Sequence, residues 1–344
     1  MPDATEEFQR RQALKEEAKA EGSLHDIPLQ REVAAAADVP GAQLPPGVDR
    51  ELADAAGAGI VIASQRELAW RRFKKHKAAM VSGVVLIIII IGSLAAPLLT
   101  SYTFSETDVT SPLQGPSMKH YFGTDTLGRD AFTRVLYGGR ISLLVGFAVA
   151  IIATVIGATI GAIAGYYGGW LDNLLMRVTD LFLSVPFLVV LILGSLLLGP
   201  GVLDTVIILS LFFWMYDARI VRGIYLSMKE KEFVEAARAS GASNRRIIFR
   251  EMLPNAMGPI IVASTLAVAA AILTESVLSF LGYGIQPPTP TWGNLLDDAR
   301  NLAVSAPWLI LFPGIAILIT VLCVNYIGDG LRDAFDPQGQ GKSL

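Results

Sequence analysis

Long apolar segments alternate with shorter polar connections over most of the chain. The first apolar segment, residues 79–99, has 21 residues and no charged side chain. A helix of that length crosses the roughly 30 Å hydrocarbon core of a bilayer. Five more segments follow the same pattern, at about 141–166, 174–198, 202–225, 256–281 and 308–327. The pattern predicts an all-α polytopic membrane protein with six transmembrane helices.

Small and helix-breaking residues stand at particular places in these segments. Gly157, Gly161 and Gly165 are spaced by four, which puts three small residues on one face of the second span. Such a face favours close packing of helices in lipid. Pro186 interrupts the third span, because proline removes a helical hydrogen bond and clashes with the preceding turn.

The distribution of Lys and Arg predicts the orientation in the membrane. Residues 66–77 carry six of them, and residues 219–250 carry eight. The connection between spans three and four carries none, and that between spans five and six carries only Arg300. Basic connections stay in the cytoplasm. Six spans with a cytoplasmic N-terminus also return the C-terminus to the cytoplasm, and the polar stretch before span five is then cytoplasmic.

Composition supports a membrane class and excludes others. The chain is 52% hydrophobic and 17% charged, with a mean hydropathy of +0.49 and a net charge of −3, so we expect no nucleic-acid partner. Residues 1–63 hold 12 acidic and 6 basic residues and few large apolar ones, which predicts a disordered acidic cytoplasmic tail. No apolar signal segment is expected in the first thirty residues.

A basic segment, residues 64–78, precedes the first span. Trp70 and Phe73 are three apart and would share one side of a helix. This pattern is typical of an amphipathic helix that lies at a membrane surface. A plain basic flank that orients the first span fits the residues equally well.

The chain contains no convincing catalytic or nucleotide-binding motif of its own. The C-terminal Gly-Gln-Gly-Lys-Ser lacks the first glycine of a phosphate-binding loop and the helix after it. Cys323 is the only cysteine and suits a small core residue. The three histidines are far apart and are expected at the surface; they are His25, His76 and His120. We therefore expect no enzyme activity, cofactor or metal in this chain.

Charged residues inside the spans are candidates for function by default. Asp180 and Asp217 fall near predicted span ends, and Glu275 falls towards the outer end of span five. They form no dense relay of carboxylates. We expect Glu275 to pair with a neighbouring helix rather than to carry an ion.

The polar stretch before span five has the pattern of a helix, a glycine and a second helix. Residues 231–240 are rich in alanine and charge, with Glu235 and Arg238 spaced for a side-chain pair. Gly241 is suited to the left-handed conformation that ends a helix. Ser243 is suited to cap a second helix that ends before Pro254. This predicts a rigid amphipathic elbow that docks on a partner, although a connector on the membrane surface is the alternative.

The elbow resembles the EAA loop of ABC importer permeases. That pattern is Glu-Ala-Ala, three residues, Gly, and a spacer ending in Leu-Pro; the matching residues are Glu235, Ala236, Ala237, Gly241, Leu253 and Pro254. Two further stretches, residues 120–143 and 275–293, resemble the C-type permease subunit of dipeptide, oligopeptide and nickel importers. The resemblance covers about residues 71–337.

The resemblance implies a type I ABC importer permease of the MetI-like fold in the bacterial cytoplasmic membrane. It implies a first helix and external loop at 79–140, a permease core at 141–335 with a coupling loop at 230–254, and a short cytoplasmic tail at 336–344. The implied partners are a homologous B-type permease, two ABC ATPases that hold ATP and Mg, and an external solute-binding protein that delivers peptides. Nickel or another small solute is the alternative substrate.

The two outer motifs also have purely structural interpretations. Asp125 can cap a short helix, Gly123 and Gly128 allow tight turns, and Arg129 with Asp130 can anchor the segment. Trp292 follows a proline-rich connection and suits a membrane interface. We expect Asp125, Arg129, Asp130, Glu275 and Trp292 to shape the outer docking surface or the pathway. A secondary transporter would need inverted repeats and a midplane ion site, and neither is evident.

Overall fold

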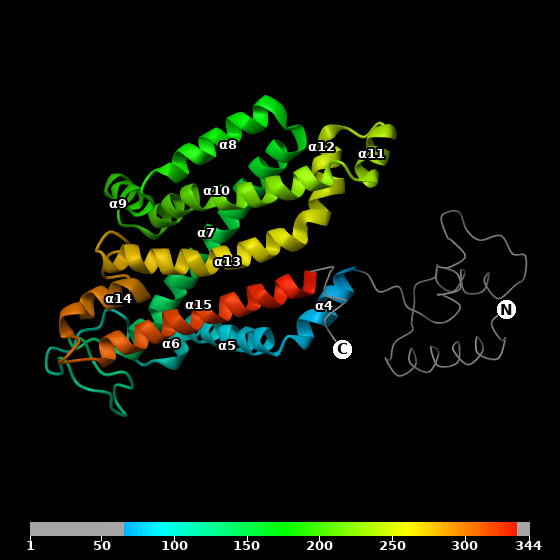
Figure 1. Ribbon diagram of the computed structural model, residues 1–344. Coiled ribbons are helices and arrows are strands. Elements are labelled where there is room, and N and C mark those ends of the chain that lie inside the picture. The colour runs from blue at the N-terminus through cyan, green and yellow to red at the C-terminus, as the bar shows by residue number, and fades with distance from the viewer. Residues whose placement is uncertain (1–64, 336–344) are drawn as a thin grey trace, which may run out of the picture. The chain divides into compact units, whose positions relative to one another are not determined.

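The computed structural model describes residues 65–335, and the elements in this range are helices (Figure 1). The helices are α4 (Gln65–Lys75), α5 (Lys77–Leu94), α6 (Ala96–Leu99), α7 (Ala131–Tyr167), α8 (Gly169–Ser184), α9 (Phe187–Leu198), α10 (Val202–Met228), α11 (Glu232–Ala239), α12 (Asn244–Arg246), α13 (Leu253–Phe280), α14 (Trp292–Ala299) and α15 (Trp308–Phe335). A π-helical turn, Ile247–Met252, joins α12 to α13, and a 3₁₀ turn, Arg300–Leu302, follows α14. The predicted tails 1–63 and 336–344 lie outside the described residues.

Four continuous helices in the described range are long and apolar enough to cross a membrane: α5, α7, the helix Asn244–Phe280, and α15. The pair α8 and α9 adds a fifth if it counts as one span, bent by 88° at the predicted break before Phe187. Helix α10 is 27 residues long but carries four charged residues, namely Asp204, Asp217, Arg219 and Arg222. Length and composition thus support four or five spans, and six spans with cytoplasmic termini stay a prediction.

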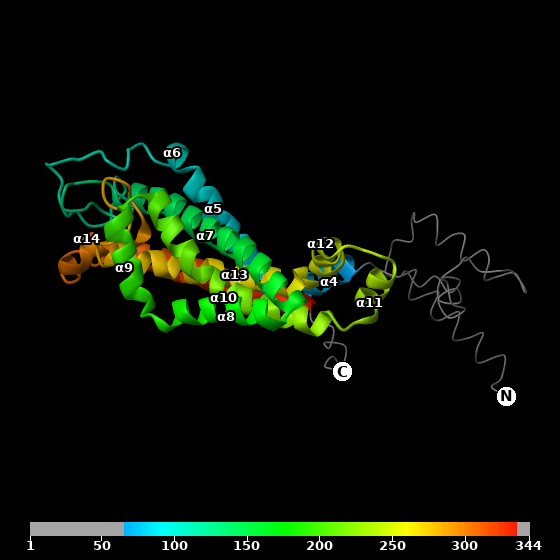
Figure 2. The ribbon, with the colours of Figure 1, turned by 90° about the horizontal axis from the view of Figure 1, so that it is seen from above.

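Helix α7 holds the bundle together. It packs most extensively along α10, and it also contacts α13, α5 and α15. Helices α10, α13 and α15 run side by side, and α7 crosses them (Figures 1 and 2). Helix α15 in turn packs on α13 and α5. Helix α8 lies at the edge of this arrangement, beside α10 and the end of α7.

The glycine face of α7 explains its close approach to α10. A Cβ atom added at Gly157 would lie 2.6 Å from the Asp217 Cβ, and one added at Gly165 would lie 2.6 Å from the Tyr225 Cβ. At Gly161 it would collide with the backbone carbonyl of Ala218. No side chain larger than hydrogen fits there without a shift of α10. The packing role predicted from the spacing is confirmed.

Helix α7 begins ten residues before the predicted start at 141. Its first turns are polar and therefore escape a search for apolar segments. Asp130 caps the helix by accepting a hydrogen bond from the Thr133 backbone N–H at 2.7 Å. Further along, the Arg140 guanidinium donates to the Ser93 carbonyl at 2.7 Å, so this polar part is tied to the end of α5.

The basic segment 64–78 forms two helices rather than one. Helix α4 ends at Lys75, and the His76 ring nitrogen Nδ1 then caps α5 by accepting from the Ala79 N–H at 3.1 Å. Trp70 and Phe73 stack with ring centroids 5.9 Å apart, as their spacing predicts. Trp70 is 55% exposed, which suits a helix at a surface.

Replacing Gly161 by alanine tests the packing of α7 on α10. We expect Gly161→Ala to lower the free energy of unfolding by about 1–3 kcal/mol, because the added methyl group overpacks the contact. Gly83→Ala is the matched control, since a Cβ atom at Gly83 in α5 meets nothing within 4 Å. The apparent Tm of the purified complex in detergent is the measurement. Equal Tm values for the two variants and the parent would contradict the packing account.

Candidate functional site

The elbow projects at one end of the bundle, where Figure 1 labels α11 and α12. Helix α11 ends in a Schellman motif: the Gly241 N–H donates to the Arg238 carbonyl at 2.9 Å and the Ala242 N–H to the Ala237 carbonyl at 3.0 Å. This motif needs a left-handed residue after the cap, and Gly241 has φ of +76°. Ser243 then caps α12 by accepting from the Arg246 N–H at 3.4 Å. The predicted helix, glycine and second helix are confirmed.

One side of the elbow is fixed to the membrane helices. Val234, Ile248 and Met252 are buried against the ends of α7 and α10. The Tyr225 hydroxyl of α10 donates to the Ile248 carbonyl at 3.0 Å, and the Tyr166 hydroxyl of α7 donates to the Asn244 side chain at 2.8 Å. These contacts define the position of the elbow relative to both helices.

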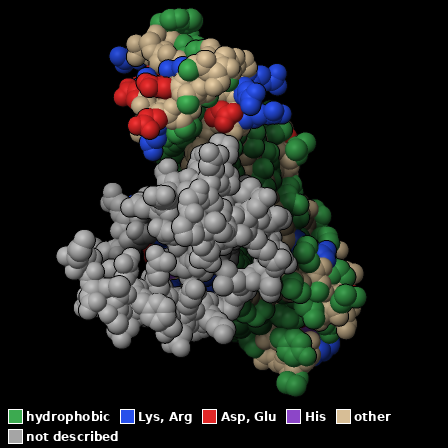
Figure 3. Space-filling view, turned by 90° about the vertical axis from the view of Figure 1, so that its right-hand side faces the viewer, with side chains coloured by type: hydrophobic (Ala, Val, Ile, Leu, Met, Phe, Trp, Pro, Cys, Tyr) green, Lys and Arg blue, Asp and Glu red, His purple; other side chains and the backbone are tan. Residues whose placement is uncertain are grey.

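The other side of the elbow is exposed. Glu235, Ala236 and Gly241 are open to solvent, and a Cβ atom at Gly241 would meet nothing within 4 Å. The expected pair between Glu235 and Arg238 does not form: the Arg238 guanidinium lies instead over the Tyr166 ring, 5.4 Å from its centroid. That interaction between a cation and an aromatic face leaves the Glu235 carboxylate unpaired within residues 65–335. Charged side chains gather at this end of the molecule (Figure 3).

The elbow continues directly into α13, so Pro254 is not the boundary that the sequence suggests. Helix α12, the π turn and α13 form one helix of 37 residues, Asn244–Phe280. Pro254 is the second residue of α13 and directly follows the π turn. The Leu253 N–H reaches back five residues to the Ile248 carbonyl, which is the hydrogen bond of a π turn. Leu253 itself is half-buried, and Pro254 is exposed.

A second candidate site lies at the opposite end of the bundle, around Asp125. Its Oδ1 accepts from the backbone N–H groups of Leu127 and Arg129, both at 2.9 Å. Its Oδ2 accepts from Arg129 Nε at 2.6 Å and from Arg134 at 2.7 Å. Arg134 also donates to Asp298 at 3.2 Å. Asp125 therefore ties the loop to α7 and α14, and it does not cap a helix as expected.

Asp130 makes a separate buried contact beside this cluster. Besides capping α7, its Oδ2 lies 2.8 Å from His120 Nδ1. His120 is only 2% exposed, so the expectation of a surface histidine is wrong for this residue. Gly123 and Gly128 have φ of +74° and +71°, and this confirms the tight turns predicted at both. The loop is thus held by side chains at several points along its length.

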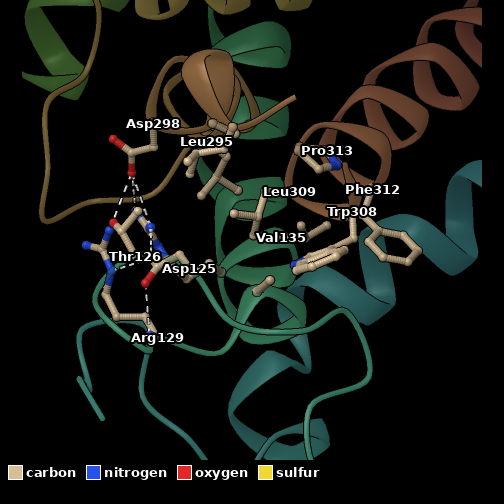
Figure 4. A pocket seen from close by; sticks show the side chains of 14 residues that line it. Asp125, Thr126, Arg129, Val135, Leu295, Asp298, Trp308, Leu309, Phe312 and Pro313 are labelled. Carbon is tan, nitrogen blue, oxygen red and sulfur yellow. Dashed lines mark hydrogen bonds and ion pairs between the residues drawn. The ribbon is translucent and has the colours of Figure 1, made fainter. Parts of the chain in front are cut away.

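The Asp125 cluster lines a small cavity of about 30 Å³ (Figure 4). Ion-paired side chains stand on one side of it, and the rings of Trp308 and Phe312 lie on the other. Arg134 Nε and Trp308 Nε1 are buried and without a hydrogen-bond partner in the described part of the chain. A cavity of this size holds about one water molecule. It is too small for a substrate.

Glu275 and Trp292 belong to a third cluster, which joins α7, α13 and the start of α14. The fully buried Glu275 carboxylate accepts from the Ser142 hydroxyl at 3.1 Å and from the Ser279 hydroxyl at 2.8 Å. The Trp292 backbone N–H donates to the Ser142 oxygen at 3.2 Å, and its indole Nε1 donates to the Val135 carbonyl at 3.0 Å. Glu275 thus pairs with a neighbouring helix, as expected. Trp292 is 1% exposed, so its ring is packed in the protein core and is not in contact with lipid.

The structure therefore brings Asp125 and Arg129 together but places Glu275 and Trp292 in a different network. Sequence reasoning missed Arg134, Asp298 and Ser142, which complete the two clusters. The signal available for Arg134 was a charged residue shortly before an apolar segment, and its burial is visible only in the structure. Asp298 lies 164 positions from Arg134, and no local pattern predicts that contact. Residues 65–335 contain no group of three or more His, Cys, Asp or Glu placed to hold a metal.

An all-helical polytopic protein with a fixed elbow at one end and closed polar loops at the other has the architecture of a transporter's membrane component. The chain matches the family model of the binding-protein-dependent transport system inner membrane component over residues 157–338. Residues 64–116 match the model of the N-terminal TM domain of oligopeptide transport permease C. The chain belongs to this family of inner membrane components of ABC importers.

Curated relatives align over most of their length. The dipeptide transport system permease protein DppC of Alkalihalophilus pseudofirmus is 44% identical over 270 residues, which cover 78% of this chain and 89% of that protein. The oligopeptide transport system permease protein OppC of Escherichia coli K12 is 45% identical with the same coverage. OppC of Mycobacterium tuberculosis is 43% identical over 277 residues, covering 80% of this chain and 95% of the relative.

A solved structure shares the fold. A chain of the MetNI methionine ABC transporter, in an inward facing conformation, superposes with a TM-score of 0.50 at 19% identity. The match covers 58% of this chain and 96% of that chain. The MetI-like fold expected from the elbow motif is confirmed by this match and by the family model.

Removing Arg134 tests the cluster around Asp125. We expect Arg134→Gln to lower the free energy of unfolding by about 1–3 kcal/mol, because Asp125 and Asp298 lose their α7 partner while Arg129 still pairs with Asp125. Arg300→Gln is the control: its pair with Asp297 is long, at 3.5 Å, and exposed, so about 1 kcal/mol or less is expected. The apparent Tm of the purified complex is the readout. A shift as small as that of the control would mean that the cluster does not hold the loop.

Proposed function

We propose that the chain forms half of the translocation path of an ATP-driven importer for dipeptides or oligopeptides. An external solute-binding protein delivers the peptide, and a homologous B-type permease forms the other half of the path. A peptide substrate is supported by the relatives, which are named dipeptide and oligopeptide permeases and are 43–45% identical over most of their length.

The elbow is the part of the chain on which the ATPases act when they bind and hydrolyse ATP. Two ABC ATPases bind below the two permeases and hold ATP and Mg, and each receives one elbow in a cleft. Glu235, Ala236 and Gly241 present the exposed side of the elbow to that cleft. Ala237 and Leu253 pack against the buried side of the elbow, and Pro254 is exposed where the elbow continues into α13. The chain itself needs no cofactor for this role.

The observation that carries this proposal is the helix Asn244–Phe280. It starts in the elbow and ends beyond Glu275, at the opposite end of the bundle. A displacement of the elbow by the closing ATPases therefore moves α13 as a whole. The same displacement strains the contacts of Tyr225 and Tyr166 with the elbow, so α10 and α7 follow.

At the outer end, the clusters shape the surface on which the binding protein docks. Asp125, Arg129 and Asp130 fix the loop between α6 and α7. Glu275 and Trp292 fix the start of α14 against α13 and α7. Because all of these residues except Arg129 are buried, they act by holding the surface in shape.

Substitution of Gly241 tests the coupling role of the elbow. We expect Gly241→Val to abolish peptide uptake and to uncouple ATP hydrolysis from the binding protein, while the permease pair still assembles. Valine in the left-handed conformation costs of order 1–2 kcal/mol and loosens the Schellman motif. Uptake and ATP hydrolysis are measured on the same reconstituted complex.

Gly282→Val is the matched control. Gly282 has φ of +81° and free space around its Cα, so the substitution introduces the same strain at the outer end. A loss of 1.4 kcal/mol of coupling free energy at the elbow corresponds to about tenfold in rate. We therefore expect the control to transport at least about tenfold faster than Gly241→Val. We expect Glu235→Ala to lose peptide uptake in the same way as Gly241→Val. Normal transport by both elbow variants would show that the stretch is only a connector.

A further inference from the structure

Helix α8 exposes a row of polar side chains, whereas α5 and α15, which also lie at the surface of the bundle, expose mainly apolar ones. Asn173, Arg177, Asp180 and Ser184 are all exposed, and their spacing of four, three and four places them in one row along the helix. We call these four residues the polar row of α8. A second exposed row, Trp170, Leu174, Leu181 and Val185, is apolar. At 3.6 residues per turn the two rows lie about a quarter of a turn apart.

The polar row is extended by α10. Arg219 donates to Asp180 at 2.5 Å, and the two side chains are 47% and 50% exposed. Tyr216, one turn before Arg219 on α10, is 62% exposed. The polar row, Tyr216 and Arg219 together form one surface across two helices, and we call it the α8–α10 wall.

The pair Asp180 and Arg219 lies away from the ends of α8 and α10, whereas Asn173 stands near the start of α8. Asp217, two residues from Arg219, is 4% exposed and accepts from Thr154 in the middle of the apolar part of α7 at 2.8 Å. Asp217 thus packs against the middle of α7, and its position near a span end stays a prediction. Helices α5 and α15 expose apolar side chains instead, such as Val84, Ile88, Leu318 and Leu322. Those faces suit lipid, and charged residues half exposed at the depth of Arg219 do not.

The backbone gives an independent argument for water at the same place. The chain leaves the helical conformation at Val185 and Pro186, and both residues are exposed. Non-helical backbone inside a membrane occurs only where protein buries it or a water-filled cavity adjoins it. Beyond the break, α9 is entirely apolar apart from Gly194 and Ser195. The polar row ends where the helix bends.

We infer that the α8–α10 wall lines the water-filled path through which the peptide passes, and that its groups meet the peptide backbone and termini. This inference rests on the proposed function for the nature of the substrate. Arg177 and Arg219 suit the terminal carboxylate, and Asp180 suits the terminal ammonium group. Asn173, Ser184 and Tyr216 supply hydrogen bonds to amides. Contacts with groups that every peptide shares leave side-chain preference to other parts of the system.

Cysteine accessibility tests the wall in the complete complex with its partner subunits, reconstituted in vesicles. Single cysteines replace Asn173 and Ser184 in the polar row, and Leu174 and Leu181 in the apolar row serve as matched controls, all in a Cys323→Ala background. The probe is a charged, membrane-impermeant thiol reagent added to both sides, and the extent of reaction is read from the mass of this chain.

We expect Asn173→Cys and Ser184→Cys to react at least ~10-fold faster than Leu174→Cys and Leu181→Cys, because the thiolate is the reactive form and a thiol against lipid or packed protein stays protonated. Equal rates in the two rows, or no reaction in the polar row, would overturn the inference. Peptide uptake by the Cys323→Ala parent tests the proposed function separately. If the Cys323→Ala parent imports no peptide while only the polar-row cysteine variants react with the reagent, the peptide assignment is refuted and the water-lined wall stands.

Discussion

Unbroken helical structure from Asn244 to Phe280 is the constraint on which the proposed coupling mechanism depends. Two prolines, Pro254 and Pro259, stand in this helix, and either one can break or kink a helix. Pro254 is tolerated because it sits in the first turn after a π turn. The wider turn sends the Leu253 N–H to the Ile248 carbonyl, and the buried Tyr225 hydroxyl bonds the same carbonyl. The junction is therefore held by α10 as well as by its own backbone.

The two ends of this helix are anchored in different ways, and the difference suits their roles. The elbow end is amphipathic, with one apolar side packed on α7 and α10 and one exposed side. The outer end carries Glu275, whose carboxylate is buried and meets the hydroxyls of Ser142 and Ser279. Unsatisfied polar groups are costly in such a place. The hydrogen bond from Ser142 fixes α13 against α7, and the one from Ser279 lies within α13. Movement at one end thus has a defined consequence at the other.

Local patterns predicted the apolar helices, the break before α9, the glycine face of α7 and the elbow with Gly241 at its turn. They failed where long-range contacts decide the outcome. Asp125 binds Arg134 and does not cap a helix, His120 is buried by Asp130, and Trp292 is in the core. The sequence predicts a helix boundary at Pro254 because the π turn that accommodates the proline has no sequence signature. The clusters at the outer end join residues far apart along the chain, and no spacing rule reaches them.

The central claim is tested most directly by distances within the helix Asn244–Phe280 during the ATP cycle. Spin labels at Arg245 and Leu281, two exposed sites at its opposite ends, are introduced as cysteines in a Cys323→Ala complex. A third label at Lys77 in α5 provides an outside reference. The account predicts that the distance from Arg245 to Leu281 stays the same with and without trapped nucleotide, while the distance from Arg245 to Lys77 changes. A change between Arg245 and Leu281 would place a hinge within this helix, at the π turn or at Pro259, and would contradict transmission along a rigid helix.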